Sequence, residues 1–134
     1  MEERIAAGTL AEFAAAMFDL NGLKLVNDTQ GHEAGNRLII QACRMICEHF
    51  KHSPVFRIGG DEFAAILEGQ DYQNRAAILA AFNGQVEENQ RSGQAVVAAG
   101  MAEFAPGQDD SFQVVFERAD REMYLRKKEL KEMK

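Results

Sequence analysis

Three acidic residues stand where they could bind a metal ion together. Asp19 ends an apolar run, and Asp61 and Glu62 follow two glycines in a short turn. Magnesium prefers oxygen ligands and is usually held by one or two carboxylates together with phosphate oxygens and water. Any one of these residues alone would more often be an ordinary turn or strand-end residue. Their combination predicts a site for magnesium (or manganese).

The two glycines before these carboxylates, Gly59 and Gly60, have two possible roles. Because glycine lacks a Cβ atom, a ligand can approach its backbone closely. Glycine also adopts the positive φ angles that tight hairpin turns need. Both roles can hold together, so we expect a hairpin whose tip is open to a ligand.

The hydrophobic pattern predicts the elements that would position these residues. An apolar run precedes Asp19, although its alanines suit a helix as well as a strand. Pro54 separates a helical pattern from two short strand patterns on either side of the glycine turn. The expected elements are a strand in the second half of 12–20, a helix at 34–50, strands at 55–58 and 63–67, a helix at 72–89, a strand at 95–104 and a last helix capped at 109–111.

The order strand, helix, hairpin, helix, strand, helix predicts an α+β fold of the ferredoxin-like kind, with a central sheet and helices on one face. The hairpin would carry Asp61 and Glu62, and the first strand would bring Asp19 beside them. In the last helix, Phe112 and Met123 belong to one apolar stripe. The charged stretch 126–131 is expected to continue this helix with a solvated face.

Composition excludes several classes of function. The chain has 134 residues, of which 46% are hydrophobic and 27% charged, as in a single soluble domain. A net charge of −6 argues against a nucleic-acid partner. No apolar run is long enough to cross a bilayer, so we expect a cytoplasmic domain without membrane contact. Cys43 and Cys47 lack the spacing of a zinc site and are expected to be reduced.

Three segments together resemble one protein family. Residues 57–63 (RIGGDEF) match the signature of the GGDEF family, residues 18–36 (FDLNGLKLVNDTQGHEAGN) resemble its metal and guanine segment, and residues 119–127 (ADREMYLRK) resemble its closing helix. The segments follow the family's order and spacing over roughly residues 10–131. The resemblance implies a palm-type sheet with the signature hairpin at the active site. It also implies a bacterial diguanylate cyclase, which joins two GTP molecules into cyclic di-GMP and releases two pyrophosphates.

The resemblance also implies roles for individual residues. Metal would be bound by Asp19, Asp61, Glu62 and the Leu20 carbonyl; Asp61 would be the base for the 3′-hydroxyl, with Glu62 assisting; and substrate would contact Lys24, Asn27, His32, Asn36, Gly59, Gly60 and Lys127. Simpler roles remain open for several of them. Lys24 and Lys127 could be exposed helix lysines, His32 a turn or capping residue, and Asn27 a turn former.

The chain departs from the family pattern at three places. Asn36 stands where the family has an aspartate, and an amide offers one acceptor oxygen where a carboxylate accepts both guanine donors. Residues 50–53 (FKHS) replace the Arg-x-x-Asp segment of the product-inhibition site, so we expect no tight feedback by that route. The family's opening segment is missing, and we expect a single domain over 1–134 that lacks its first segment.

Three functions therefore compete. The first is a diguanylate cyclase that binds GTP, needs a homodimer and follows a sensory domain in a full-length parent, whose anchoring in the membrane stays open. The second is a weak or inactive module that binds GTP as a regulatory ligand or binds a protein partner. The third is a cyclase of altered base choice. Intact Asp19, Asp61 and Glu62 favour an active enzyme, whereas Asn36 favours the alternatives.

Overall fold

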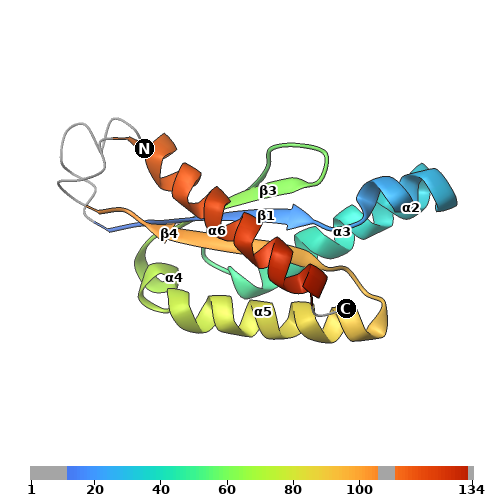
Figure 1. Ribbon diagram of the computed structural model, residues 1–134. Helices are drawn as coiled ribbons and strands as arrows, with labels where there is room; N and C mark the ends of the chain where they lie inside the picture. Colours follow the sequence, from blue (N-terminus) through green and yellow to red (C-terminus); the bar gives the residue numbers. More distant parts are fainter. Residues whose placement is uncertain (1–11, 106–110, 133–134) are drawn as a thin grey trace.

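A computed structural model describes residues 12–105 and 111–132 of the chain. This part of the chain contains both helices and strands, as Figure 1 shows. In chain order they are β1 (Ala14–Leu20), α2 (Leu23–Gln30), α3 (His32–His49), β2 (Val55–Arg57), β3 (Glu62–Leu67), α4 (Gly69–Gln73), α5 (Arg75–Ser92), β4 (Val97–Glu103) and α6 (Phe112–Glu132).

The strands form one antiparallel sheet in the order β2-β3-β1-β4. β1 lies in the middle, and its Phe18 pairs with Phe63 of β3 on one side and with Ala99 of β4 on the other. β2 and β3 form the expected hairpin. The predicted α+β architecture, with a central sheet, flanking helices and a signature hairpin, is confirmed.

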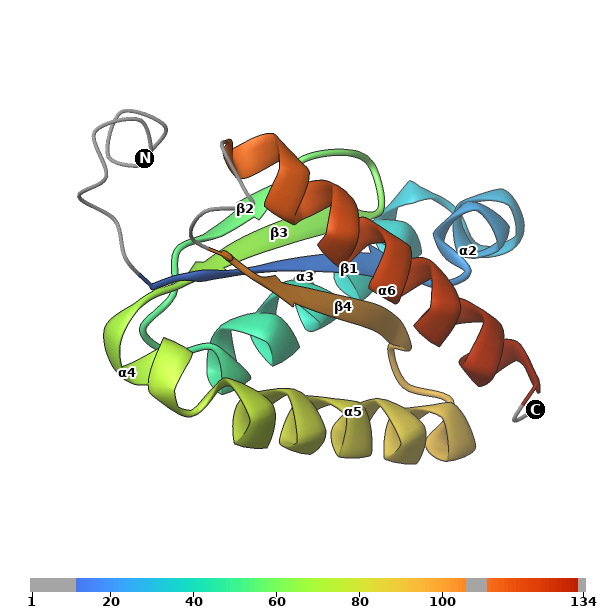
Figure 2. The same ribbon diagram turned by 60° about the vertical axis from the view of Figure 1, so that its left-hand side comes forward.

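The expectation that all helices cover one face of the sheet is wrong. α3 and α5 cover one face, and α6 crosses the other (Figure 2). Phe18 points to the first face, where its ring meets Phe50 and Phe82 edge-on at 5.3 and 5.5 Å between centroids. Because both faces of β1 are covered, all seven of its residues are buried, which explains an apolar run without alternation.

Small residues let α6 lie close to the sheet. A Cβ atom on Gly100 of β4 would collide with the backbone of α6 at Ala119 and Met123. A helix backbone cannot move aside as a flexible side chain can, so this contact fixes the height of α6 above β4. The Ala14–Ala16 run of β1 is completely buried between the two helical layers.

Several predicted element boundaries differ from the structure. The short helix α2 was not expected, and the helix expected at 72–89 consists of α4 and α5, which Asn74 separates. Of the predicted cap of the last helix, Asp109 and Asp110 lie outside the described residues. Ser111 accepts a hydrogen bond from the Val114 N–H at 3.4 Å and caps α6 as predicted.

Two sequence-based expectations concern the molecule as a whole. None of the helices in residues 12–105 and 111–132 is long and apolar enough to cross a membrane. Cys43 and Cys47 are free thiols on α3, the first half-buried and the second exposed.

The contact between β4 and α6 predicts the effect of two glycine substitutions. Gly100→Ala should lower the free energy of unfolding by about 1–3 kcal/mol, because the added methyl group pushes α6 off the sheet. Gly84→Ala is the matched control, since a Cβ atom there meets no other atom and alanine favours the helix by about 0.5–1 kcal/mol. Urea unfolding of both variants measures the difference. Equal stabilities would contradict this account of the helix position.

Candidate functional site

The predicted carboxylates meet where β1 ends beside the hairpin. Asp19 pairs directly with Glu62 of β3, so the two side chains leave the sheet on the same face. The backbone N–H of Leu20 donates a hydrogen bond to the Asp61 carbonyl oxygen at 2.7 Å. The hairpin register therefore brings Asp19, Asp61 and Glu62 to one corner of the sheet, as the sequence predicted.

Asp19 is a buried carboxylate that is only partly paired. It is 8% exposed, and its Oδ2 atom accepts a hydrogen bond from the Lys127 amine of α6 at 2.8 Å. Its Oδ1 atom is buried and has no hydrogen-bond partner. An ionised carboxylate buried in this way is costly unless a cation meets it. The free oxygen therefore fits a hard metal ion, with Asp19 as its ligand.

The electrostatics of this corner are those of crowded negative charge. Burial, followed by the charges of Asp19, Asp120 and Asp61, raises the pKa of Glu62, and only Lys127 acts against this. The hydrogen bond to Asp19 in turn raises the pKa of Lys127, so that its amine stays protonated. Groups whose pKa values are shifted by burial and by neighbouring charges gather at functional sites, so this corner is a candidate for one.

The side chains alone do not form a closed metal cage. In the described part of the chain, no group of three or more histidine, cysteine, aspartate or glutamate side chains could hold a metal ion. Magnesium seldom needs such a cage, because substrate phosphates and water commonly complete its coordination. The four-ligand set of Asp19, Leu20, Asp61 and Glu62 stays a prediction.

Gly59 and Gly60 do not adopt the positive φ angles that we expected of this turn. The turn is instead held by the Ile58 N–H, which bonds to the Glu62 carbonyl at 2.9 Å, and by Arg57. The Arg57 guanidinium donates to the carbonyls of Gly59 and Gly60 at 3.2 and 2.9 Å. A Cβ atom on Gly60 would meet no other atom of the protein. Close approach of a ligand is thus the remaining reason for glycine at this position.

A second corner, formed by α2 and α3 beyond the end of β1, holds four of the predicted substrate-binding residues, namely Lys24, Asn27, His32 and Asn36 (Figure 1). Asn27 belongs to α2 and not to a turn, and its side chain fills the space where Gly35 of α3 lacks a Cβ atom. His32 is the first residue of α3, after the cap residue Gly31. His32, Asn36 and Lys24 are all exposed.

A cleft of about 400 Å³ opens beside Asp19, between the end of the sheet and the last turns of α6. Its lining includes Lys128 and Lys131, which the sequence predicts on a solvated face, and Tyr124, which had no predicted role. Lys127 and Lys131 are four residues apart and share one face of the helix. This spacing was the signal available in the sequence. The cleft joins a basic wall to the acidic corner and suits a phosphate chain with its cation.

The segment that replaces the product-inhibition motif is bonded to the protein itself. The His52 N–H and the Ser53 hydroxyl donate to the buried Asp71 carboxylate at 2.9 and 2.6 Å. Ser53 is thus directed towards α4. The absence of tight feedback stays a prediction.

The raised pKa of Glu62 predicts how stability depends on pH. A raised pKa in the folded state means that ionised Glu62 weakens the fold above its ordinary pKa of 4.5. Glu62→Gln should therefore melt at a higher temperature than the parent near pH 7. The difference should shrink below pH 4.5, where the parent side chain is protonated as well. Thermal unfolding between pH 4 and 8 tests this, and a variant less stable at pH 7 would contradict it.

Comparisons with known proteins agree with this geometry. The chain is 34% identical over 77 residues to the diguanylate cyclase DgcN of Escherichia coli. This match covers 52% of this chain and 19% of that protein. It is 34% identical over 67 residues to the bifunctional diguanylate cyclase/cyclic di-GMP phosphodiesterase MucR of Pseudomonas aeruginosa, covering 49% of this chain and 10% of that protein. The chain thus spans less than a fifth of either relative.

Solved structures show the same fold. The GGDEF domain of DgcB from Caulobacter crescentus, in complex with c-di-GMP, is 30% identical, with a TM-score of 0.74 over 94% of this chain and 77% of that one. The active GGEEF domain of a diguanylate cyclase from Vibrio cholerae, at 20% identity, shares the fold with a TM-score of 0.78 over 96% and 84%. The model of the family described as "Diguanylate cyclase, GGDEF domain" matches residues 2–133, and the chain belongs to the GGDEF domain family.

Proposed function

We propose that this domain is a diguanylate cyclase, which condenses two GTP molecules into cyclic di-GMP and releases two pyrophosphates. The observation that carries the proposal is Asp19, a buried carboxylate with one unpaired oxygen, opposite Glu62 and at the edge of a cleft lined by lysines. A cation held by Asp19 would lie where the phosphates of a nucleotide could enter the cleft. The similarity to the cyclases DgcN and DgcB supports this proposal.

The acidic corner would hold the metal and activate the attacking group. Asp19, the Leu20 carbonyl, Asp61 and Glu62 would be the ligands. When bound, magnesium supplies positive charge that polarises the α-phosphate and offsets the charge of the leaving group. Asp61 would accept the proton of a 3′-hydroxyl, whose oxygen attacks the α-phosphorus of the second GTP. The bond from that phosphorus to the β-phosphate oxygen breaks, pyrophosphate leaves, and the second linkage forms in the same way.

The basic wall of the cleft would bind the triphosphate. Lys127 is protonated and already faces Asp19, so it can turn from the carboxylate to a phosphate when a cation takes its place. Lys131 and Lys128 line the same cleft and would contact the outer phosphates. Gly60 leaves the space above the hairpin open for close approach of the nucleotide, and a Cβ atom on Gly59 would contact only Glu62, at 3.7 Å. Lys24 of α2 would contact the phosphates from the α2–α3 corner.

The base would lie in the α2–α3 corner. Asn27 and Asn36 offer amide groups there, and His32 stands at the start of α3. Two GTP molecules must face each other for both linkages to form, so the proposed reaction needs a homodimer in which each subunit holds one GTP. In the full-length protein we place this domain in the cytoplasm, after a sensory domain that controls pairing.

The test of the proposed function uses the chain, and a full-length parent, with magnesium and GTP, ATP or both. Cyclic di-GMP identified by mass supports the proposal, and loss of product in Asp61→Asn assigns it to this site. GTP binding without product would favour the regulatory module. Absence of both product and GTP binding would overturn the proposal.

Because the space above the hairpin is open, Gly60→Ala separates an effect on nucleotide binding from an effect on stability. It should leave the free energy of unfolding within about 0.5 kcal/mol of the parent, because the added methyl group contacts no protein atom. It should weaken binding of a nonhydrolysable GTP analogue about tenfold or more, because the methyl group occupies the path of the nucleotide. Gly84→Ala, on an exposed helix surface, is the control and should bind as the parent does. Unchanged binding in Gly60→Ala would contradict this role.

Asn36 is the observation that favours altered base choice. Asn36→Asp restores a carboxylate that accepts both guanine donors, and should strengthen GTP binding by about 1–3 kcal/mol while leaving ATP binding unchanged. Calorimetric titration of both nucleotides with the parent and the variant measures the change. Equal GTP affinity and unchanged preference between the two nucleotides would show that position 36 does not read the base.

A further inference from the structure

The two helical layers meet beyond the edge of the sheet. β4 is an edge strand, with α6 crossing one face of the sheet and α5 running along the other (Figure 2). The residues of β4 from Val97 to Gly100 are nevertheless buried. An exposed edge strand invites pairing with other chains, so covering it with helices is a common protection. Past this edge, the last turns of α6 are held by the buried side chain of Leu130 and by further support from α5.

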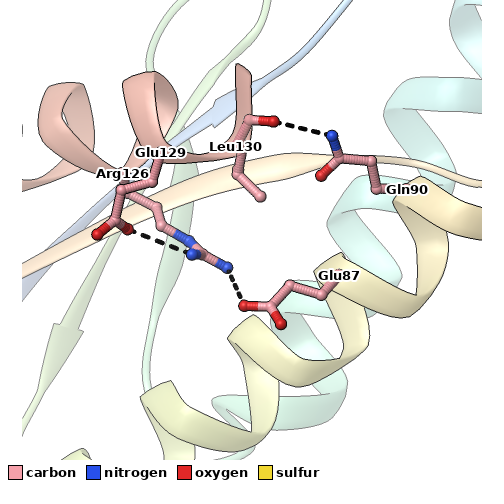
Figure 3. A network of polar contacts seen from close by, with 5 residues as sticks. All are labelled: Glu87, Gln90, Arg126, Glu129 and Leu130. Carbon is pink, nitrogen blue, oxygen red and sulfur yellow. Dashed lines mark hydrogen bonds and ion pairs between the residues drawn. The ribbon is translucent and has the colours of Figure 1, made fainter. Parts of the chain in front are cut away.

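Long polar side chains provide that support, as Figure 3 shows. One guanidinium nitrogen of Arg126, Nη2, lies 3.0 Å from Oε2 of Glu87 on α5. The Gln90 side chain of α5 donates a hydrogen bond to the Leu130 carbonyl of α6 at 2.9 Å. Glu129 holds the other Arg126 terminal nitrogen at 3.3 Å, but it belongs to α6 itself. Only Glu87 ties the guanidinium to the opposite helix among these contacts.

Burial makes this ion pair different from its neighbour on the surface. The Arg126 side chain is only 11% exposed, and its Nε atom is buried without a hydrogen-bond partner. Glu88, the next residue of α5, instead pairs with Arg91 on the same helix, and these side chains are 65% and 67% exposed. Exposed pairs contribute little, whereas a buried charge depends on its partner. The sequence predicts a solvated face for the stretch 126–131, and for Arg126 this prediction is wrong.

We propose that Glu87 and Arg126 are a positioning pair that fixes the last turns of α6, so that Lys127 is presented to Asp19 and to the triphosphate. Lys127 directly follows Arg126, and its amine reaches Asp19 only while this part of α6 stays in place. The same turns carry Lys131 into the cleft. The inference rests on the proposed function where it concerns the nucleotide.

A double-mutant cycle tests the proposal. The variants are Glu87→Ala, Lys127→Met and their combination, and Glu88→Ala is the matched control because it removes a neighbouring glutamate of the same helix. Binding of a nonhydrolysable GTP analogue with magnesium is measured by calorimetry. If Glu87 acts through Lys127, its removal should weaken binding roughly three- to tenfold, and the double variant should bind no more weakly than Lys127→Met alone. Glu88→Ala should bind as the parent does.

Two results would overturn the proposal. One is binding in Glu87→Ala that equals that of the parent. The other is a loss of affinity in the double variant equal to the product of the two single losses, as expected if the Glu87 substitution damages the structure independently of Lys127. If Glu87→Ala does not fold, Glu87→Gln takes its place in the cycle. If the parent binds no nucleotide, the proposed function fails, and the cycle is read from urea unfolding. Non-additive losses of stability would then support the positioning pair, and additive losses would overturn it.

Discussion

The buried carboxylate of Asp19 is the constraint on which the site depends. It is the one charged residue in β1, a strand covered on both faces, and it lies at the end where the chain leaves the sheet. A carboxylate there must meet a cation or lose its charge. Lys127 meets one oxygen and leaves the other without a partner. The fold therefore buries a carboxylate with one oxygen paired and the other free, and the free oxygen can bind a metal ion.

The position of Asp19 constrains distant parts of the chain. The lysine reaches Asp19 because α6 crosses the sheet at a fixed height, and Gly100 sets that height. The hairpin must pair in one register, since a shift by a single residue would turn Glu62 to the opposite face. With that register, burial and then the charge of the facing Asp19 raise the pKa of Glu62. The site is thus built at some cost to the stability of the metal-free fold, as is common at functional sites.

Hydrophobic patterns predicted β1, β3, β4 and the long helices because those segments bury one face or both. The pattern of α6 predicts a buried stripe but not which face of the sheet it covers, and α6 lies opposite α3 and α5. α2 was missed because it has eight residues, of which only Leu23 is buried. The Arg126 pair was missed because it joins α6 to α5, and the sequence of one helix does not show which helix lies beside it. Lys131 was missed although its four-residue spacing from the predicted Lys127 places both on one face of α6.

Two glycines show how the fold and the site constrain the sequence differently. Gly100 is needed by the fold, because the backbone of α6 occupies the space of its side chain. Gly60 has neither a positive φ angle nor a close neighbour, so the folded chain would accept alanine there. The same holds for the unpaired Oδ1 atom of Asp19 and for the crowded Glu62, because neither stabilises the isolated fold. The fold does not need these features, yet they gather at one corner of the sheet. Binding of a ligand at this corner explains them best.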